Sequence, residues 1–143
     1  KELNVKVMIC PVIRAAVGML DGMLEVLPDA SVGFLGYQRN EETLKPNFFY
    51  AKLPKDNKER IAILIDPMFA TGGTAIESVK YLQEKGIKNI LFISIVSALE
   101  AVTKFTELFP NIPVFTAQID EKLNDKGYIV PGLGDAGDRI YNT

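Results

Sequence analysis

Residues 61–75, with the sequence I-A-I-L-I-D-P-M-F-A-T-G-G-T-A, constrain the fold more than any other stretch of this chain. The first five residues are all apolar, which is typical of a strand covered on both faces, as in parallel sheets. Small residues follow, and residues 76–86 have the apolar spacing of an amphipathic helix. The stretch therefore predicts a buried strand, a glycine turn and a helix, in that order.

Asp66 stands where this strand should emerge from the sheet. The small residues at 70–74 let backbone N–H groups approach a ligand, and a helix N-terminus favours a phosphate. Asp66 would then be placed to bind sugar hydroxyls, or a metal ion that arrives bound to the phosphates. We interpret the stretch as a ribose phosphate site. The plainer alternative is a tight turn before a capped helix, with Thr74 and Glu77 as the capping box.

The composition describes one soluble globular domain of 143 residues, 48% apolar and 24% charged. Sixteen basic and eighteen acidic residues leave a net charge of -2, and no Lys/Arg run marks general nucleic-acid binding. The chain has no histidine, which excludes Ser-His-Asp triads and His-ligated zinc. Any metal is therefore expected on oxygen ligands.

Three further features predict a cytoplasmic protein without a membrane span. Cys10 is the single cysteine, so it forms no disulfide within the chain, and its apolar neighbours indicate an inert core thiol. The longest apolar run, residues 90–99, is too short to cross a bilayer. Residues 1–14 lack the pattern of a signal peptide.

The N-terminal part predicts a strand followed by a helix. Residues 5–10 (V-K-V-M-I-C) are mostly apolar, and Pro11 is expected to end that strand. Residues 14–27 repeat apolar side chains at helical spacing. Gly18 and Gly22 weaken this helix, so we expect another backbone to pack closely against it.

Residues 31–38 and 48–53 have the patterns of two further strands, joined by a charged and turn-rich segment. We interpret residues 37–53 as an arm, or hairpin, that could close over a site and exclude water. An ordinary exposed connection is the alternative.

The second half predicts another strand, helix and strand. Residues 89–96 form a buried strand, Ser97 and Glu100 a capping box for a helix that ends near Phe109, and residues 111–119 a last strand. The order of elements indicates a single α/β domain with a mainly parallel sheet flanked by helices. Ligands should gather at the carboxyl ends of its strands.

Residues 120–139 show no periodicity but contain a literal G-x-G-x-x-G at 132–137. We reject a dinucleotide site there, because Pro131 interrupts any preceding strand and the chain stops at Thr143. A glycine-rich loop is the better account. Its exposed backbone groups could match the donor and acceptor pattern of a flat heterocycle.

Four stretches of this chain resemble the type I phosphoribosyltransferases. I-L-I-D followed by T-G-G-T is similar to their signature for phosphoribosyl pyrophosphate (PRPP). Pro67 stands where most of that family place a second acid, and D-P-M-x-A-T-G-G-[ST] resembles the uracil phosphoribosyltransferase branch. P-V-I-R-A-A-V-G-M-L-D-G-M, Arg39 and Y-I-V-P-G-L-G-D-A-G-D-R match other stretches of that branch.

The resemblance implies a type I phosphoribosyltransferase fold over residues 1–143, with the β-arm at 37–53, a PRPP loop at 66–74 and a C-terminal uracil loop at 128–138. The family usually carries an N-terminal segment ahead of the first motif found here. The PRPP-binding residues implied are Arg14, Arg39, Asp66, Pro67, Met68, Phe69, Ala70, Thr71, Gly72, Gly73, Thr74 and Asp135. Those for uracil are Ile129, Gly134, Asp135 and Ala136.

The reaction implied is the salvage of uracil with PRPP to UMP and diphosphate, with Mg²⁺ held through PRPP and not directly by the protein. Arg14, Arg39, Asp66 and Asp135 are the catalytic candidates; Asp135 could hold a Mg²⁺-linked water or help remove the N1 proton. Asp120 and Glu121 resemble a family D-E pair that we interpret as structural. Family habit suggests a homodimer or higher homo-oligomer, without nucleic acid or membrane as a partner.

Two alternatives stay open at this stage. A regulatory protein of the same fold could sense PRPP or UMP without turnover. Another transferase of the class could act on a purine or on orotate, but the carboxylate of orotate would call for a cation, and residues 129–137 contain none.

Overall fold

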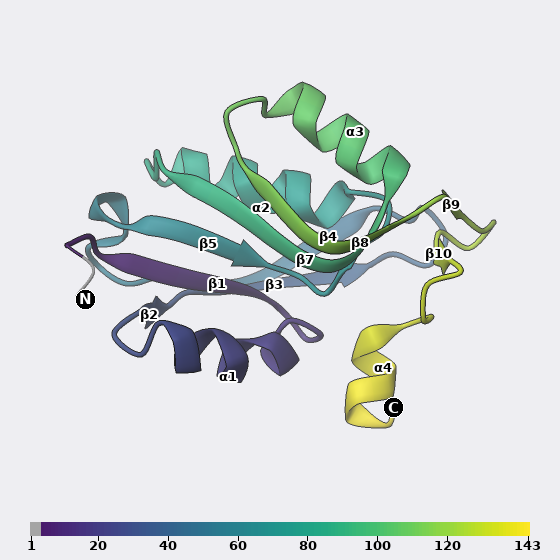
Figure 1. The fold of residues 1–143 in the computed structure, drawn as a ribbon, viewed down its shortest axis with the longest axis horizontal. Coiled ribbons are helices and arrows are strands. Elements are labelled where there is room, and N and C mark those ends of the chain that lie inside the picture. The colour runs from purple at the N-terminus through teal and green to yellow at the C-terminus, as the bar shows by residue number, and fades with distance from the viewer. Residues whose placement is uncertain (1–3) are drawn as a thin grey trace.

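A computed structural model describes residues 4–143 as one sheet with helices on both faces (Figure 1). The main sheet contains β1 (Val7–Ile13), β2 (Ser31–Val32), β3 (Phe34–Arg39), β4 (Pro46–Lys52), β5 (Ile61–Ile65), β6 (Met68–Phe69), β7 (Ile90–Ala98) and β8 (Val114–Asp120). The helices are α1 (Val17–Val26), α2 (Gly73–Glu84), α3 (Leu99–Leu108) and α4 (Ala136–Tyr141), with a 3₁₀ turn at Asn57–Glu59. Two short strands, β9 (Lys122–Leu123) and β10 (Ile129–Val130), form a separate hairpin.

The main sheet has the order β4-β3-β1-β5-β7-β6, with β2 beside β1 and β8 beside β7. Every pair is parallel except β3 and β4, which form the predicted hairpin. Helices α2 and α3 cover one face and α1 covers part of the other (Figure 1). The prediction of an α/β fold with a mainly parallel sheet is confirmed.

Aromatic packing fixes the region that follows β5. Phe69, Phe92 and Phe105 are almost fully buried, and the Phe69 ring lies edge-on to the other two, with centroid distances of 4.8 and 5.6 Å. Offset and edge-to-face pairs of this kind add stability beyond the area they bury. The cluster ties β6 to β7 and α3, and so anchors the chain just before the glycine turn.

Cys10 lies in the same core and is fully buried, and burial raises the pKa of its thiol to about 12. A neutral thiol is a poor nucleophile, so the residue behaves as a small apolar side chain, as expected from its neighbours.

Several sequence expectations about element ends were wrong. β1 does not stop at Pro11 but runs to Ile13, since the missing N–H falls where the pairing on one side passes from β2 to β3. Neither capping box forms: α2 has Gly72 and α3 has Ala98 at the N-cap, both without a side-chain hydrogen bond. The Ser97 hydroxyl instead bonds to Thr116, at 2.8 Å.

The tail is also more regular than its sequence suggested, with β9, β10 and α4 inside a stretch that lacks periodicity. The expectation that another backbone packs closely against α1 at Gly18 and Gly22 is right only in part. A Cβ at Gly18 would meet the Ile140 side chain of α4 at 3.2 Å, whereas one at Gly22 would meet nothing within 4 Å among the described residues. The contact that does form at Gly18 is with the Ile140 side chain, and no backbone of residues 4–143 outside the helix lies closer to that position.

In the part of the chain that the structure describes, no helix is both long and apolar enough to cross a membrane.

Candidate active site

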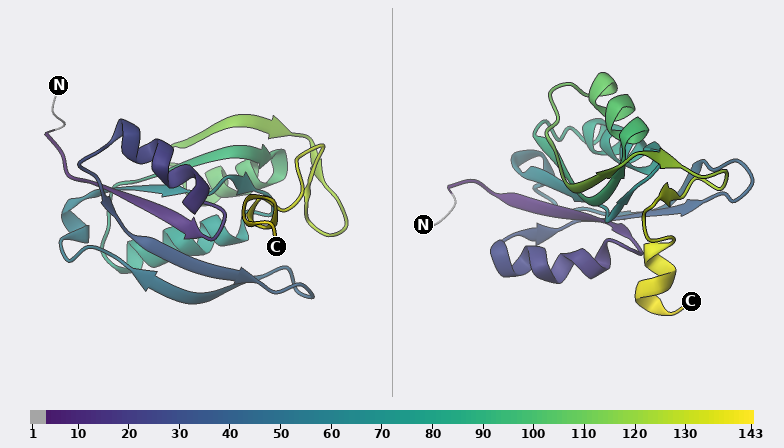
Figure 2. Two further views of the ribbon diagram at one scale, coloured as in Figure 1. Left: turned by 90° about the horizontal axis from the view of Figure 1, so that it is seen from below. Right: turned by 45° about the vertical axis from the view of Figure 1, so that its right-hand side comes forward.

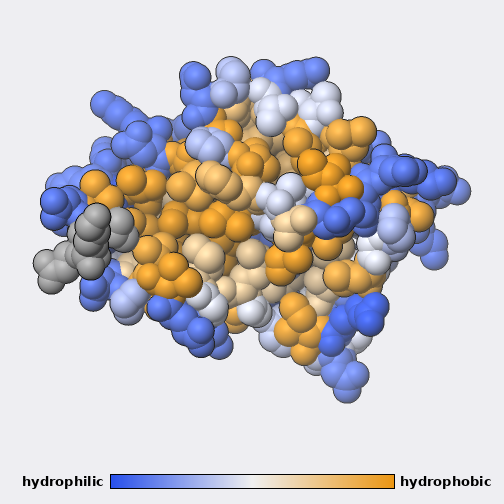
Figure 3. Space-filling view, in the orientation of Figure 1, coloured by the Kyte–Doolittle hydropathy of each residue, from blue (hydrophilic) through white to orange (hydrophobic). Residues whose placement is uncertain are grey.

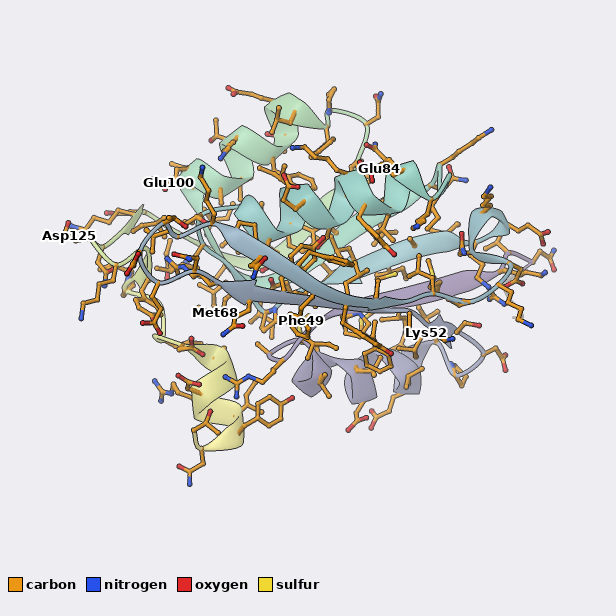
Figure 4. All side chains as sticks on the ribbon, turned by 180° about the vertical axis from the view of Figure 1, so that it is seen from behind. Phe49, Lys52, Met68, Glu84, Glu100 and Asp125 are labelled. Carbon is orange, nitrogen blue, oxygen red and sulfur yellow. The ribbon has the colours of Figure 1, made fainter. Side chains whose placement is uncertain are left out.

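Two adjoining cavities, of about 170 and 610 Å³, lie where β1 and β5 end, between the sheet, the arm and the tail. Both are lined by Arg39, Asp66, Thr74 and Asp135, so they form one continuous hollow. In Figure 4, Met68 marks this region, between the sheet and α4. The predicted site residues from four distant stretches of sequence thus meet at the carboxyl end of the parallel strands, where such folds bind ligands.

Asp66 follows the last residue of β5, and its side chain lines both cavities. One carboxylate oxygen accepts a hydrogen bond from the Met68 N–H at 3.2 Å. Burial raises the pKa of Asp66 to about 7, and this hydrogen bond opposes the rise only in part. The group can therefore change its charge near neutral pH when a ligand offers it hydrogen-bond donors.

The glycine turn lines the smaller cavity with Ala70, Thr71, Gly72 and Thr74. Gly72 has φ +82°, a conformation that glycine adopts without strain, and α2 begins directly after it. Gly72 provides no side-chain cap, and the Gly73 N–H donates to Thr71 Oγ1 at 3.4 Å. The N–H groups of Thr74 and Ala75 have no partner among the described residues and stay available to an anion. The turn has the geometry of a phosphate cradle.

Two members of the predicted PRPP loop do not line the cavities. Pro67 is buried, and its carbonyl accepts hydrogen bonds from the N–H groups of Ile95 and Val96 at 3.2 and 3.0 Å. Gly73 faces the arm, where a Cβ would lie 3.2 Å from Pro46. Pro67 holds the loop to β7, and Gly73 leaves room for the arm.

Arg39 is the last residue of β3 and lines both cavities. Its Nη2 donates to the carbonyl of Lys126 at 2.8 Å, and its guanidinium lies 5.7 Å from the centre of the Tyr128 ring. Its Nε–H is buried and has no acceptor among residues 4–143. A buried donor without a partner is costly, and the oxygen of an anionic ligand would satisfy it.

Arg14 lines the larger cavity and is held by the tail. It forms a salt bridge with Asp138 at 2.8 Å and donates to the Thr143 hydroxyl at 3.1 Å. The Arg14 hydrogen bond is the main cause that lowers the pKa of Asp138 below its usual value. Both groups are about half exposed, so this pair can open to admit a ligand at little cost.

The predicted uracil loop places Ile129, Gly134 and Ala136 on the smaller cavity. Asp120, which is 7% exposed, accepts a hydrogen bond from the Gly132 N–H at 2.9 Å and so fastens the loop to the end of β8. This contact accords with the structural role expected for Asp120. Gly132 has φ +44°, and a Cβ there would overlap the Ile129 carbonyl oxygen.

Asp135 lines both cavities and is also the N-cap of α4, accepting a hydrogen bond from the Asp138 N–H at 2.8 Å. Capping occupies one carboxylate oxygen and leaves the other for the cavity. Among the described residues, no three His, Cys, Asp or Glu side chains gather as a metal site.

The sequence did not single out several residues that line the cavities: Ala15, Leu44, Ala75, Gly127, Tyr128, Gly137 and Asp138, the partner of Arg14. Leu44 does fall in the predicted arm, and the last three fall in the predicted uracil loop. The one signal that could have found them is their position in the sequence, because most of these residues stand next to a motif. Which neighbours face the hollow depends on the path of the tail, and the sequence has no periodicity there.

The fold is that of the type I phosphoribosyltransferases. Adenine phosphoribosyltransferase of Trypanosoma brucei, solved with AMP, pyrophosphate and ribose-5-phosphate, superposes with a TM-score of 0.66 at 17% identity, over 94% of this chain and 63% of that chain. A purine phosphoribosyltransferase of Pyrococcus horikoshii gives a TM-score of 0.63 at 16% identity, over 80% and 71%.

More similar proteins define the family. The AQ2163 protein of Aquifex aeolicus has a TM-score of 0.93 at 41% identity, over 98% of this chain and 67% of that chain. The uracil phosphoribosyltransferase of Campylobacter concisus is 68% identical over all 143 residues, which span 69% of its length. The family model for uracil phosphoribosyltransferase matches residues 1–143, and this chain belongs to that family.

Proposed function

We propose that this protein transfers the phosphoribosyl group of PRPP to N1 of uracil and releases UMP and diphosphate, a reaction of pyrimidine salvage. The observation that carries the proposal is the 68% identity, over the whole chain, to the uracil phosphoribosyltransferase of C. concisus. The hollow supports it, because an anion cradle, two arginines and a backbone loop meet there. The relatives favour an enzyme over a regulator of the same fold.

Each part of the site has a place in this reaction. Backbone N–H groups of residues 71–74 hold the 5′-phosphate, and Asp66 accepts hydrogen bonds from the ribose hydroxyls. Arg14 and Arg39 take up the charge of the leaving diphosphate as the bond from the ribose C1 atom breaks. Backbone groups of Ile129, Gly134 and Ala136 bind the edge of uracil.

The acidic groups fit a magnesium ion that arrives with PRPP. Asp66 and Asp135 both line the larger cavity, and Mg²⁺ in proteins usually keeps several of its waters, so an ion held by the phosphates of PRPP need not be bound directly by either carboxylate. When bound, the ion would neutralise charge on the diphosphate. Asp135 could bind it through a water, or could instead help remove the N1 proton of uracil.

The direct test is UMP formation from uracil and PRPP with Mg²⁺, with parallel reactions containing orotate, hypoxanthine or adenine. We expect turnover with uracil alone, because the base loop offers no cation to the orotate carboxylate. Turnover with another base would reassign the substrate. A protein that binds PRPP or UMP but converts no base would support the regulatory alternative.

We also propose a homodimer or higher homo-oligomer. The strands between α1 and α3 present an apolar face (Figure 3), and Ile95 and Phe115 are 43% and 57% exposed. Exposed apolar patches commonly mark contacts between proteins. Light scattering should give a mass of at least two chains, and a single-chain mass at assay concentration would exclude the proposal.

A cytoplasmic location follows from the proposed reaction, because PRPP is a charged metabolite that does not cross membranes unaided. Cell fractionation that finds the protein outside the cytoplasm would contradict this location.

A further inference from the structure

The arm arginine is bound to the turn between β9 and β10, which leads into the base loop. Figure 2 shows the tip of the β3–β4 arm and the β9–β10 hairpin at the same end of the molecule. The direct contact is the hydrogen bond from Arg39 Nη2 to the Lys126 carbonyl, between residues 87 positions apart. The Tyr128 ring lies beside the same guanidinium, within the range of a cation–π contact.

The turn that offers this carbonyl is built rigidly. Asn124 Oδ1 accepts hydrogen bonds from the N–H groups of Lys126 and Tyr128 at 2.9 and 3.0 Å. The backbone N–H of Asn124 donates to the Tyr128 carbonyl at 2.8 Å, and the Gly127 N–H to the Asn124 carbonyl at 2.9 Å. These bonds leave the Lys126 carbonyl free to accept from Arg39. Asp125 marks the same turn at the outer end of the molecule in Figure 4.

Gly127 is the position that lets the arginine approach. A Cβ there would overlap Arg39 Nη2 and would lie 3.4 Å from the Thr71 methyl group. Gly127 also has φ +73°, which side chains other than glycine rarely adopt. The turn at 124–128 is therefore wedged between the arm and the PRPP loop, and only a residue without a side chain fits at its centre.

We propose that residues 124–128 form a clasp that holds Arg39 over the site before any substrate binds, with Gly127 and Tyr128 as positioning residues for this arginine. Tyr128 is also the first residue of the base loop, so the clasp links the diphosphate side of the site to the base side. Arg39 is thereby ordered before PRPP arrives, and less entropy is lost on binding. The kinetic part of this inference rests on the proposed function, whereas the clasp itself does not.

Limited trypsin digestion of the free protein tests the clasp without any assumption about the reaction. In the tip of the arm trypsin can cut only after Arg39, because Lys45 precedes Pro46 and is resistant. We expect Gly127→Ala to raise the rate of cleavage between Arg39 and Asn40 at least fivefold. Tyr128→Leu should raise it less, and Tyr128→Phe, which keeps the ring, should leave it unchanged.

Gly86→Ala is the matched control. Gly86 has φ +85°, so an alanine there brings a similar backbone strain, yet the atoms near its Cβ belong to the flexible Lys58 side chain. Gly86 precedes the start of β7, whereas Arg39 lies at the end of β3, so the two are at opposite ends of the parallel strands. This variant should be cut after Arg39 at the rate of the unaltered protein. Equal rates in Gly127→Ala and the unaltered protein would overturn the clasp, as would equal acceleration in both alanine variants.

Kinetics then test the positioning role. Gly127→Ala should raise KM for PRPP at least fivefold, and Arg39→Ala should raise it by a similar or larger factor. The double variant should be no worse than Arg39→Ala alone, because both changes remove the same interaction. Additive losses would overturn the positioning role. If the unaltered protein shows no turnover, the proposed function fails, and the proteolysis result still decides the clasp.

Discussion

Asp66→Asn is expected to lower kcat/KM for PRPP by at least about 100-fold while the protein stays folded. In the proposed complex this carboxylate accepts hydrogen bonds from the ribose, and bonds to a charged acceptor contribute about 1.5–3 kcal/mol each. Asparagine keeps the size and one acceptor but loses the charge. Steady-state kinetics with circular dichroism as the folding check measure the effect, and a loss below tenfold would remove Asp66 from its proposed role.

The Asp66→Asn change should also alter how the KM for PRPP depends on pH. Burial raises the pKa of Asp66 to about 7 in the free protein, whereas hydroxyl donors or a cation favour the charged form. Binding of PRPP should therefore release a proton, and its KM should rise as the pH falls from 8 towards 6. The Asn variant provides the control, since the part of this rise that remains in it comes from the phosphates of PRPP.

The same group also makes the stability of the free protein depend on pH. Its pKa is higher in the folded state than the ordinary 3.8, so its contribution is fully present below pH 3.8 and is lost as the pH rises to about 7. The pKa shift corresponds to a change of up to about 4 kcal/mol in the free energy of unfolding, and water in the open cavity makes this change smaller. The free energy of unfolding, measured in urea, should differ between pH 5 and pH 8, and this difference should be smaller in Asp66→Asn than in the unaltered protein.

Gly132→Ala is expected to abolish uracil binding while PRPP still binds. The added Cβ would overlap the Ile129 carbonyl oxygen, so the loop must move away from the end of β8. That movement breaks the hydrogen bond from the Gly132 N–H to Asp120 and leaves a buried carboxylate less satisfied. The backbone of Ile129, proposed to contact uracil, shifts with it.

Calorimetry with UMP and with PRPP separates the two sides of the site. We expect UMP affinity to fall at least tenfold more than PRPP affinity. Gly134→Ala is the matched variant, because Gly134 has φ +80° in the same loop but no atom of the described residues lies within 4 Å of the added atom. Gly134→Ala should lower the UMP affinity less than Gly132→Ala does. Equal loss in the two variants would contradict the overlap with Ile129 as the cause of the effect.

Much of this site could be predicted from the sequence because its motifs are contiguous. The apolar run before Asp66, the glycine turn and the string at residues 128–139 each carry their chemistry in neighbouring residues. All four catalytic candidates and most predicted ligand residues line the two cavities. Pro67 and Gly73 do not, since a contiguous motif also contains residues that only shape its backbone.

What was missed is held by contacts between residues far apart in the chain. Arg14 meets Asp138 across 124 positions, and Arg39 meets Lys126 across 87. The cap of α4 by Asp135 could have been inferred locally, but glycines and Pro131 obscure the helix that follows. The two predicted capping boxes fail for a different reason. Their residues have the local pattern of a cap, but tertiary contacts set where α2 and α3 begin and override that pattern.

The sequence by itself determined the class of fold, the phosphate turn and the family resemblance, because these depend on the order and periodicity of adjacent residues. Only the tertiary structure decided the environment of each group: the burial that raises the pKa of Asp66, the tail that holds Arg14 and the turn that holds Arg39. Burial and long-range pairing arise when the sheet and the tail close around one hollow, and no local pattern encodes that closure.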